Sequence, residues 1–239
     1  MEQRTYGLPQ EALKLIACIS MLIDHFGVGI VRQLNTPWMI DLYYACRILG
    51  RFAFPIYCFL LVEGMRRTRN PGKYILRLAM GILLAELPFD LLFEGGFTWG
   101  YQSVMVTLTL GAMMLLCMQK TDKKWLKILL VVPFAILAGL AKCDYGSGGI
   151  VMIAVFALFE QLAIQTVALW LVNRELLPTA AVRIFGFVLR IQLLALLAQI
   201  PIGLYNGRKL SHSKALQWGF YLFYPVHLLV LWMILLIIR

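Results

Sequence analysis

The sequence predicts an all-α, polytopic integral membrane protein with about eight transmembrane helices and both termini in the cytoplasm. Hydrophobic residues make up 61% of the 239 residues and charged residues only 14%, and the mean hydropathy is +0.80. Soluble domains are closer to half apolar and a quarter charged, so this composition is typical of a chain in a bilayer. The apolar runs are about 20 residues long and lack strong period-two alternation, which favours helices over barrel strands.

Eight apolar runs are the expected spans, and polar or turn-forming segments such as "RRTRNPGK" and "NGRKLSHSK" separate them. There is no internal repeat, low-complexity tract or soluble domain in the sequence, so residues 1–239 are expected to form a single transmembrane domain. The expected spans cover residues 11–31, 47–65, 74–93, 103–119, 125–141, 149–171, 183–205 and 216–238.

The placement of Lys and Arg predicts the orientation of the spans. With the N-terminus in the cytoplasm, most basic residues fall in cytoplasmic segments, in agreement with the positive-inside rule. The outer side then holds Arg32, Lys142, Arg208, Lys209 and Lys214. Three of these lie in "NGRKLSHSK", so this one segment disagrees with the rule.

Composition also argues against several classes of protein. The five cysteines include no CxxC pair and fall mostly in apolar runs, which indicates free thiols and neither a disulfide framework nor a zinc site. The net charge of +10 follows from basic loops on one side of a membrane, and no RNA-binding motif is present. We therefore expect neither nucleic-acid binding nor a bound metal.

The first expected span carries Lys14, Asp24 and His25, which are costly in hydrocarbon and therefore candidates for function. Lys14 and His25 are eleven residues apart, so they share one face of a helix about 16 Å apart along its axis. Asp24 points about 100° away from His25. A partner for His25 should therefore come from another span. The alternatives are that Lys14 only reaches toward the headgroups and that His25 is a packing residue.

Charged residues also occur in the second and third expected spans. Arg47 and Arg51 are one turn apart, and Arg51 lies deep enough in its span to need a partner. Glu86 and Asp90 are four residues apart with Pro88 between them. They predict either a buried cluster with Arg51 or an acid/base site; a metal site is disfavoured because no second His is near.

Two further groups have both structural and functional interpretations. Glu63 is followed by Arg66 and Arg67, which are able to pair with it on the helix surface. Asp144 and Tyr145 precede three glycines, where Asp144 would serve as a helix cap.

The last expected span begins "FYLFYPVHLL" and contains Tyr224 and His227. Interfacial anchoring explains the tyrosine better than it explains a second histidine within a span. His227 is therefore a candidate site residue.

Several segments resemble, in order along nearly the whole chain, the segments of the TraX family. They are "LKLIACISMLIDHFG", "GRFAFPIYCFLLVEGMRRTRNPGKYILRL", "AELPFDLLF", "VTLTLGAM", "CDYGSGG", "LYNGR" and "FYLFYPVHLL". The founding activity of that conjugal-transfer family is N-terminal acetylation of the pilin subunit. The Lys14-x10-His25 pattern is also similar to the Arg/Lys-x10-His signature of transmembrane acyltransferases of the acyltransferase-3 type, which use cytoplasmic acyl-CoA.

The resemblance implies a role for each candidate. Lys14 would meet a phosphate of acetyl-CoA, and His25 would act at the acyl group as the base that deprotonates the acceptor. Arg51 or Tyr224 would stabilise the oxyanion, and Asp24 would pair with Arg51 or Arg47. Further candidates for the phosphates are Arg66, Arg67, Arg69 and Lys73; Glu63, Glu86, Asp90, Asp144 and Tyr145 are candidates for a substrate-binding or structural polar cluster.

The resemblance therefore implies an acetyltransferase of the bacterial cytoplasmic (inner) membrane that modifies a peptide, glycan or lipid acceptor at or across the membrane. Its expected partners are acyl-CoA, the acceptor and membrane lipids. Two alternatives remain open. A proton-coupled transporter would also place Asp24, His25, Glu86 and Asp90 within spans, although the repeated halves typical of transporters are absent from the sequence. A non-catalytic membrane subunit of a conjugation or secretion apparatus is the second alternative.

Overall fold

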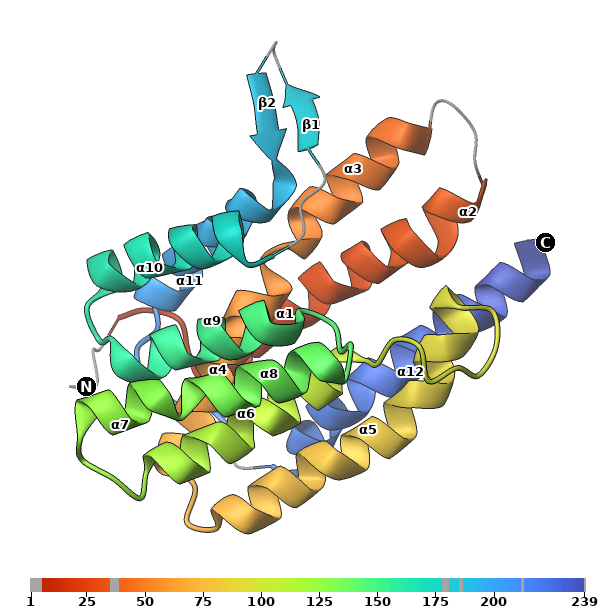
Figure 1. Ribbon diagram of the computed structural model, residues 1–239. Coiled ribbons are helices and arrows are strands. Elements are labelled where there is room, and N and C mark those ends of the chain that lie inside the picture. The colour runs from red at the N-terminus through yellow and green to blue at the C-terminus, as the bar shows by residue number, and fades with distance from the viewer. Residues whose placement is uncertain (1–5, 35–38, 178–180, 185–186, 212, 239) are drawn as a thin grey trace. The chain divides into compact units, whose positions relative to one another are not determined.

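The computed structural model describes residues 6–34, 39–177, 181–184, 187–211 and 213–238, which fold almost entirely into helices (Figure 1). The predicted all-α class is therefore confirmed, with the exception of one short antiparallel hairpin. The hairpin pairs β1 (Ala181–Ile184) with β2 (Phe187–Arg190), in the register Ala181 to Arg190.

Three helical stretches are long and apolar enough to cross a membrane, by length and composition. They are Gln10–Leu34, Met39–Arg67 and Lys214–Ile238. Val104–Met118, Gly146–Leu158 and Ile191–Gly203 are apolar but shorter. The predicted count of about eight spans is thus not reproduced by helix length in the described residues, and it stays a prediction.

The chain divides into two compact units, and the prediction of a single domain is not tested by this division. The first unit contains residues 1–57, 88–96 and 178–239, and the second contains residues 58–87 and 97–177. Helices α4 (Ala53–Arg67) and α5 (Pro71–Phe93) each contribute residues to both units.

The first unit holds the N-terminal and C-terminal helices. These are α1 (Gln10–Phe26) and α12 (Lys214–Ile238). Besides the hairpin, the unit also contains the π-helical turn η1 (Gly27–Val31), α2 (Arg32–Leu34), α3 (Met39–Gly50), the 3-10 helix η2 (Ile191–Ala198) and α11 (Gln199–Gly203). In this unit α1 packs against both α3 and α12.

The second unit is built from the middle of the chain. Its remaining helices are α6 (Val104–Met118), α7 (Lys124–Leu129), α8 (Val131–Leu140), α9 (Gly146–Leu158) and α10 (Leu162–Glu175). Helix α9 packs against α6, α8 and α10. Ile150, Met152 and Ile153 of α9 are fully buried, so α9 forms the centre of this unit.

Helices α1 and α12 run in parallel. Lys14 lies beside Phe220, with the ammonium 5.1 Å from the ring centroid, and farther along both helices His25 contacts His227. Two parallel spans begin on one side of a membrane and end on the other. The predicted placement of both termini in the cytoplasm is therefore not confirmed, and it stays a prediction.

The predicted span 183–205 is not one helix. Residues 181–184 and 187–190 form two paired strands, and helix begins only at Ile191. Val, Ile and Phe residues favour extended structure, and Gly186 separates the two strand segments in the sequence. The prediction overlooked this local preference because overall hydropathy is high throughout the segment.

The predicted spans 149–171 and 125–141 are each divided between two helices. In the first of them, α9 ends at Leu158 and α10 begins at Leu162, because Phe159 and Gln161 adopt extended backbone conformations. Glu160 and Gln161 are exposed polar residues at this break. In the second, α7 ends at Leu129 and α8 begins at Val131.

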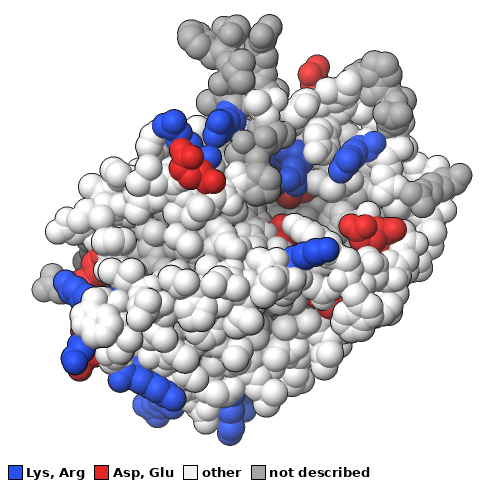
Figure 2. Space-filling model, in the orientation of Figure 1, with Lys and Arg blue, Asp and Glu red and all other residues white. Residues whose placement is uncertain are grey.

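Helix α12 has one apolar exposed face and one buried face. The exposed face presents Leu222, Val226, Leu229 and Met233, each at least 40% exposed. Leu228, Leu231 and Leu235 face the protein and are at most 4% exposed. On the face drawn in Figure 2, charged residues are scattered and most of the surface is uncharged. An apolar exposed stripe of this kind is suited to contact with lipid acyl chains.

Candidate functional site

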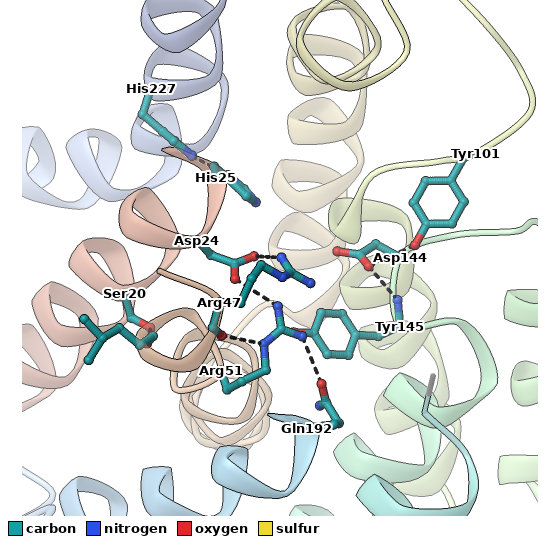
Figure 3. Close-up of polar contacts among 11 residues, drawn as sticks. Ser20, Asp24, His25, Arg47, Arg51, Tyr101, Asp144, Tyr145, Gln192 and His227 are labelled. Carbon is teal, nitrogen blue, oxygen red and sulfur yellow. Dashed lines mark hydrogen bonds and ion pairs between the residues drawn. The ribbon is translucent and has the colours of Figure 1, made fainter. Parts of the chain in front are cut away.

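A buried ion-paired cluster connects α1 with α3 in the first unit. Asp24 accepts hydrogen bonds from Arg47 Nη1 at 2.6 Å and from Arg51 Nη2 at 2.9 Å, one on each carboxylate oxygen (Figure 3). The Asp24 side chain is 13% exposed and that of Arg51 is 9% exposed. A charge in such surroundings is stable only when it is paired and hydrogen-bonded. Asp24 thus pairs with both of the arginines that the sequence offered as partners.

Arg51 also donates to two acceptors besides Asp24. Its Nε donates to the Arg47 carbonyl oxygen at 3.1 Å, and its Nη1 donates to Gln192 Oε1 at 2.9 Å. Gln192 lies on η2 and is 3% exposed. The guanidinium therefore links α1, the end of α3 and η2, which fixes its plane and orientation.

Close backbone approach makes this cluster possible. Gly50 lies directly against the Asp24 side chain, so that a Cβ at this position would collide with the carboxylate. At Gly27, a Cβ would come within 2.5 Å of the Cys46 Cβ. Ser20 Oγ also donates to the Leu49 carbonyl oxygen at 2.6 Å. Small residues allow helices to approach closely in a membrane, where packing and hydrogen bonds stabilise helix association.

A pair of histidines connects α1 with α12. His25 Nδ1 lies 2.7 Å from His227 Nε2 (Figure 3). His227 Nδ1 lies 2.6 Å from the Phe223 carbonyl oxygen. The two imidazole planes are within 6° of parallel, with centroids 5.0 Å apart. This geometry corresponds to a hydrogen bond in the plane of both rings. His25 thus has its partner on another span, as the helix geometry of the sequence indicates.

The Phe223 carbonyl oxygen determines the tautomers of both histidines. A carbonyl oxygen only accepts, so His227 donates its Nδ1–H to Phe223. A neutral imidazole carries one N–H, so with both rings neutral His227 Nε2 is an acceptor and His25 donates from Nδ1. The unprotonated nitrogen of His25 is then Nε2.

Aromatic side chains surround the His25 ring. Phe93 and Tyr224 make edge contacts with it, at centroid distances of 5.4 Å and 6.0 Å. Tyr224 is 5% exposed and lies 5.7 Å from the His227 ring centroid. Apolar ring faces therefore limit the contact of water with the histidine pair.

Cys18 and His25 follow Lys14 by four and eleven residues, so all three side chains lie on one face of α1. Cys18 Sγ lies 3.2 Å from the Tyr57 hydroxyl, and Tyr57 in turn has an electrostatic interaction with Tyr224. Polar side chains from α1, α4 and α12 therefore follow this face between Lys14 and His25.

The basic residues at positions 66–73 belong to the second unit, and two of them have structural partners. Arg67 Nη2 lies 2.8 Å from Glu63 Oε2 and Arg66 Nη1 lies 3.7 Å from Glu63 Oε1. Arg66 Nη2 also donates to the Ala157 carbonyl oxygen at 3.0 Å. Arg69 and Lys73 are exposed. Glu63 is 4% exposed, so its role here is to form the ion pairs at the end of α4.

Glu86 holds the start of α6 in the second unit. Its carboxylate accepts the Ser103 hydroxyl at 2.8 Å and the Ser103 backbone N–H at 3.1 Å, and Ser103 is the N-cap of α6. This contact satisfies a donor at a helix N-terminus. Asp90 is 1% exposed and is assigned to the first unit.

Asp144 organises the loop before α9. Its Oδ1 accepts from the Tyr101 hydroxyl and from the Tyr145 backbone N–H, both at 3.0 Å (Figure 3). Its carbonyl oxygen accepts from Thr107 Oγ1. Burial and the neighbouring Asp144 raise the pKa of Tyr101 above its usual value. Tyr145 has a positive φ of 62° and is the N-cap of α9. The prediction that Asp144 caps the helix is therefore wrong: the N-cap is Tyr145, and the contacts of Asp144 are those of a loop-forming residue.

Within the described ranges, no group of three or more His, Cys, Asp or Glu side chains is placed to hold a metal ion. The described cysteines are free thiols.

Sequence reasoning missed two residues of the first unit. Gln192 binds Arg51, and Tyr57 contacts Cys18. The signal for Gln192 was an amide inside the apolar run "IQLLALLA". Both contacts join residues far apart in the chain, so no spacing rule would have identified them.

A model of the family described as "TraX protein" matches residues 9–235 of this chain. The probable fimbrial assembly protein FimC, serogroup H1, of Dichelobacter nodosus is 29% identical over 231 residues, which cover 92% of each chain. Protein TraX of Escherichia coli is 26% identical over 149 residues, which cover 61% of this chain but only 54% of the E. coli protein. The TraX protein of strain K12 matches to the same extent. No solved structure matches this chain.

Proposed function

Because this chain belongs to the TraX family, we propose that it is a membrane-embedded acyltransferase that uses acetyl-CoA. It transfers an acetyl group from the cytoplasmic donor to an amine or hydroxyl at or across the bacterial inner membrane. The three membrane-length helices, two of which carry the histidine pair, support this location.

The observation that carries the proposal is the hydrogen-bond chain from the Phe223 carbonyl oxygen through His227 to His25. A general base needs an unprotonated nitrogen in a fixed direction. These hydrogen bonds supply such a nitrogen, because His25 donates from Nδ1 and keeps the lone pair on Nε2. Burial of His227 against Phe223 and Tyr224 limits its rotation.

In the proposed reaction, His25 Nε2 removes a proton from the acceptor as the acceptor nitrogen or oxygen attacks the thioester carbonyl carbon. The new N–C or O–C bond forms, and the C–S bond then breaks. The proton on His25 passes to the leaving sulfur, so that free coenzyme A is released and the base is regenerated.

The two candidates for oxyanion stabilisation differ in their surroundings. Arg51 already donates to Asp24, Gln192 and the Arg47 carbonyl oxygen, which supports a positioning role for it. Tyr224 lies beside both imidazoles, which supports it as the donor to the developing negative charge. In this proposal Asp24 keeps α1 and α3 together and is not itself a base.

The acceptor is proposed to be the N-terminus of a pilin-like or fimbrial subunit, ahead of a glycan or lipid. The support is the name of the Dichelobacter relative, a probable fimbrial assembly protein that aligns along almost the full length of both chains. The same name also favours a second candidate function, in which the chain is a non-catalytic membrane subunit of an assembly apparatus.

Acetyl transfer from radiolabelled acetyl-CoA separates the two functions. The full chain, purified in nanodiscs, is incubated with labelled donor and with a peptide carrying a free N-terminus and an apolar helix. The acyltransferase transfers label to the peptide, and His25→Ala loses at least about 10²-fold in kcat, the scale of general base catalysis. Phe26→Ala is the control, since Phe26 is adjacent in α1 and 38% exposed. Equal transfer by wild type and His25→Ala would exclude His25 as the base.

A further inference from the structure

The segment after α11 lies against the start of α1. Leu8 donates its backbone N–H to Leu204 at 2.8 Å, and Asn206 donates its backbone N–H to Leu8 at 3.0 Å. Gln10 donates in the same way to Arg208 at 2.9 Å. These backbone contacts align residues 204–208 with residues 8–10, although almost 200 positions separate them in the sequence.

The Glu11 side chain continues this contact. Its two carboxylate oxygens accept the backbone N–H groups of Leu210, at 3.0 Å, and of Ser211, at 3.2 Å. Asn206 Nδ2 also donates to the Gly7 carbonyl oxygen at 3.0 Å. Side-chain and backbone bonds together therefore hold residues 204–211 beside the N-terminal end of α1.

This attachment brings Arg208 and Lys209 to the Lys14 end of α1. Lys209 is close enough to Lys14 to act on it electrostatically. In the part of the chain that the structure describes, no carboxylate forms an ion pair with Lys14, Arg208 or Lys209. Glu11 interacts electrostatically with Lys14, but its carboxylate oxygens accept the two backbone N–H groups. The result is an uncompensated positive surface, and Arg208 and Lys209 are partly exposed on it.

The same attachment resolves the disagreement with the positive-inside rule. The rule was violated only because residues 206–214 were assigned to the outer side. The bonds of Asn206, Arg208, Leu210 and Ser211 to residues 7–11 place Arg208 and Lys209 at the same end of the first unit as the start of α1. With the N-terminus in the cytoplasm, these basic residues are cytoplasmic as well.

We propose that Arg208 and Lys209, together with Lys14, bind the phosphate groups of the acyl-CoA donor at the cytoplasmic end of α1. This inference rests on the proposed function and deepens it, since it assigns the donor subsite to the segment 204–211. An arginine binds a phosphate bidentately and a lysine binds it as a point charge. The thioester end of the donor then extends along α1 toward His25, about 16 Å farther along the axis.

Coenzyme A binding to the full chain in phosphatidylcholine nanodiscs tests the subsite. Phosphatidylcholine has no net charge, so anionic lipid does not compete with coenzyme A for the basic residues. We expect the double variant Arg208→Gln/Lys209→Gln to bind coenzyme A about tenfold or more weakly, because charge-assisted hydrogen bonds to phosphate are lost. Dephospho-coenzyme A, which lacks the 3′-phosphate, should bind wild type more weakly and lose less affinity in the variant.

Two further variants separate charge from folding. Lys123→Gln/Lys124→Gln removes the same charge from an exposed pair in the second unit and should leave the affinity within about twofold. The charge-conserving Arg208→Lys/Lys209→Arg should retain most of the affinity. If this conserving variant binds as poorly as the glutamine variant, the phosphate site is overturned, because folding and not charge is then responsible.

The outcomes also distinguish the two proposals. If wild type binds coenzyme A and the glutamine variant binds it equally well, the subsite is overturned while the acyltransferase function stands. If wild type binds no coenzyme A, both fail. If the glutamine variant keeps its coenzyme A affinity but binds phosphatidylglycerol more weakly than wild type, the basic surface contacts lipid headgroups. The donor subsite is again overturned.

The position of the segment has an independent readout. Ser211→Cys, whose backbone contact to Glu11 is retained, should react with a membrane-impermeant maleimide in inverted membrane vesicles and not in intact spheroplasts. Wild type controls for the native thiols. Labelling of Ser211→Cys in intact spheroplasts places the segment outside and overturns a donor site there.

Discussion

His25 Nδ1 and His227 Nε2 lie 2.7 Å apart, although 202 residues separate the two histidines in the chain. This hydrogen bond joins α1 to α12, and the Phe223 carbonyl oxygen determines its direction. His227 is in this view a positioning residue for His25, since it acts through the orientation and tautomer of the other ring.

Removal of His227 should therefore lower the rate of acetyl transfer without weakening donor binding. We expect His227→Ala to reduce kcat by about 10²-fold, because His25 is then free to rotate and to adopt the other tautomer. The KM for acetyl-CoA should change less than about twofold. Steady-state kinetics on the full chain in nanodiscs provides both values.

The conservative variant His227→Gln should recover part of the rate, because its side-chain oxygen is able to accept from His25 Nδ1–H. Leu229→Ala, an exposed position on the same helix, is the control. A loss of coenzyme A binding in His227→Ala equal to the loss of kcat would indicate a general structural role and contradict the positioning role.

Removal of the Asp24 carboxylate should strongly destabilise the protein. Asp24→Asn leaves Arg47 and Arg51 without their shared counter-charge in a largely buried setting. Breaking such a pair from one side costs about 3–5 kcal/mol. Thermal unfolding followed by circular dichroism in detergent should show a large decrease in Tm.

Glu175→Gln is the matched control for this change. Its ion pair with Arg174 is exposed, with side-chain exposures of 51% and 61%, so it should contribute at most about 1 kcal/mol. Equal Tm values for Asp24→Asn and Glu175→Gln would show that the Asp24 cluster contributes little to stability.

Gly50→Ala should destabilise the contact between α1 and α3. The new Cβ would collide with the Asp24 carboxylate, so the ion pairs must shift at a cost of about 1–3 kcal/mol. Gly219→Ala is the control, because open space surrounds Gly219 on α12 and alanine is the better helix former. Unfolding midpoints should decrease for the first variant and remain equal or increase for the second. The opposite order would contradict the close approach of Gly50 to Asp24.

The stability of the second unit should decrease at high pH through Tyr101. The raised pKa of Tyr101 means that the folded state holds the phenol proton more tightly than the unfolded state, whose tyrosine titrates near about pH 10. The stability contribution is therefore present below about pH 10 and is lost as the pH rises further. Denaturant midpoints at pH 8 and pH 11 should show a smaller loss for Tyr101→Phe than for wild type. An equal loss in both proteins would assign the effect to other groups.

The sequence anticipated the pairing of Asp24 better than the course of the helices around it. An acid and two arginines within apolar segments need each other, whatever the fold, because unpaired charges are costly there. Helix boundaries follow weaker local preferences, and the segment 183–205 shows the consequence, since its first part forms a hairpin. Average hydropathy does not distinguish a buried helix from an apolar hairpin followed by a 3-10 turn.

The contact between residues 204–211 and the start of α1 was also beyond the sequence. Counting basic residues assumes that each apolar run crosses the membrane once, and this assumption placed Arg208 and Lys209 on the outer side. The backbone bonds of residues 204–211 to residues 8–11 instead hold them beside Lys14. Hydrogen bonds between segments nearly 200 residues apart leave no periodic signal in either segment.

The sequence by itself determined that this chain is apolar and helical, that it belongs in a membrane, and that Lys14 and His25 share a helix face, because composition and the helical repeat are local properties. Only the tertiary structure decided that His227 holds His25, that Gln192 and Asp24 hold Arg51, and that the basic segment 204–211 lies beside Lys14. These relationships depend on how distant helices pack, and packing is set by the whole chain together.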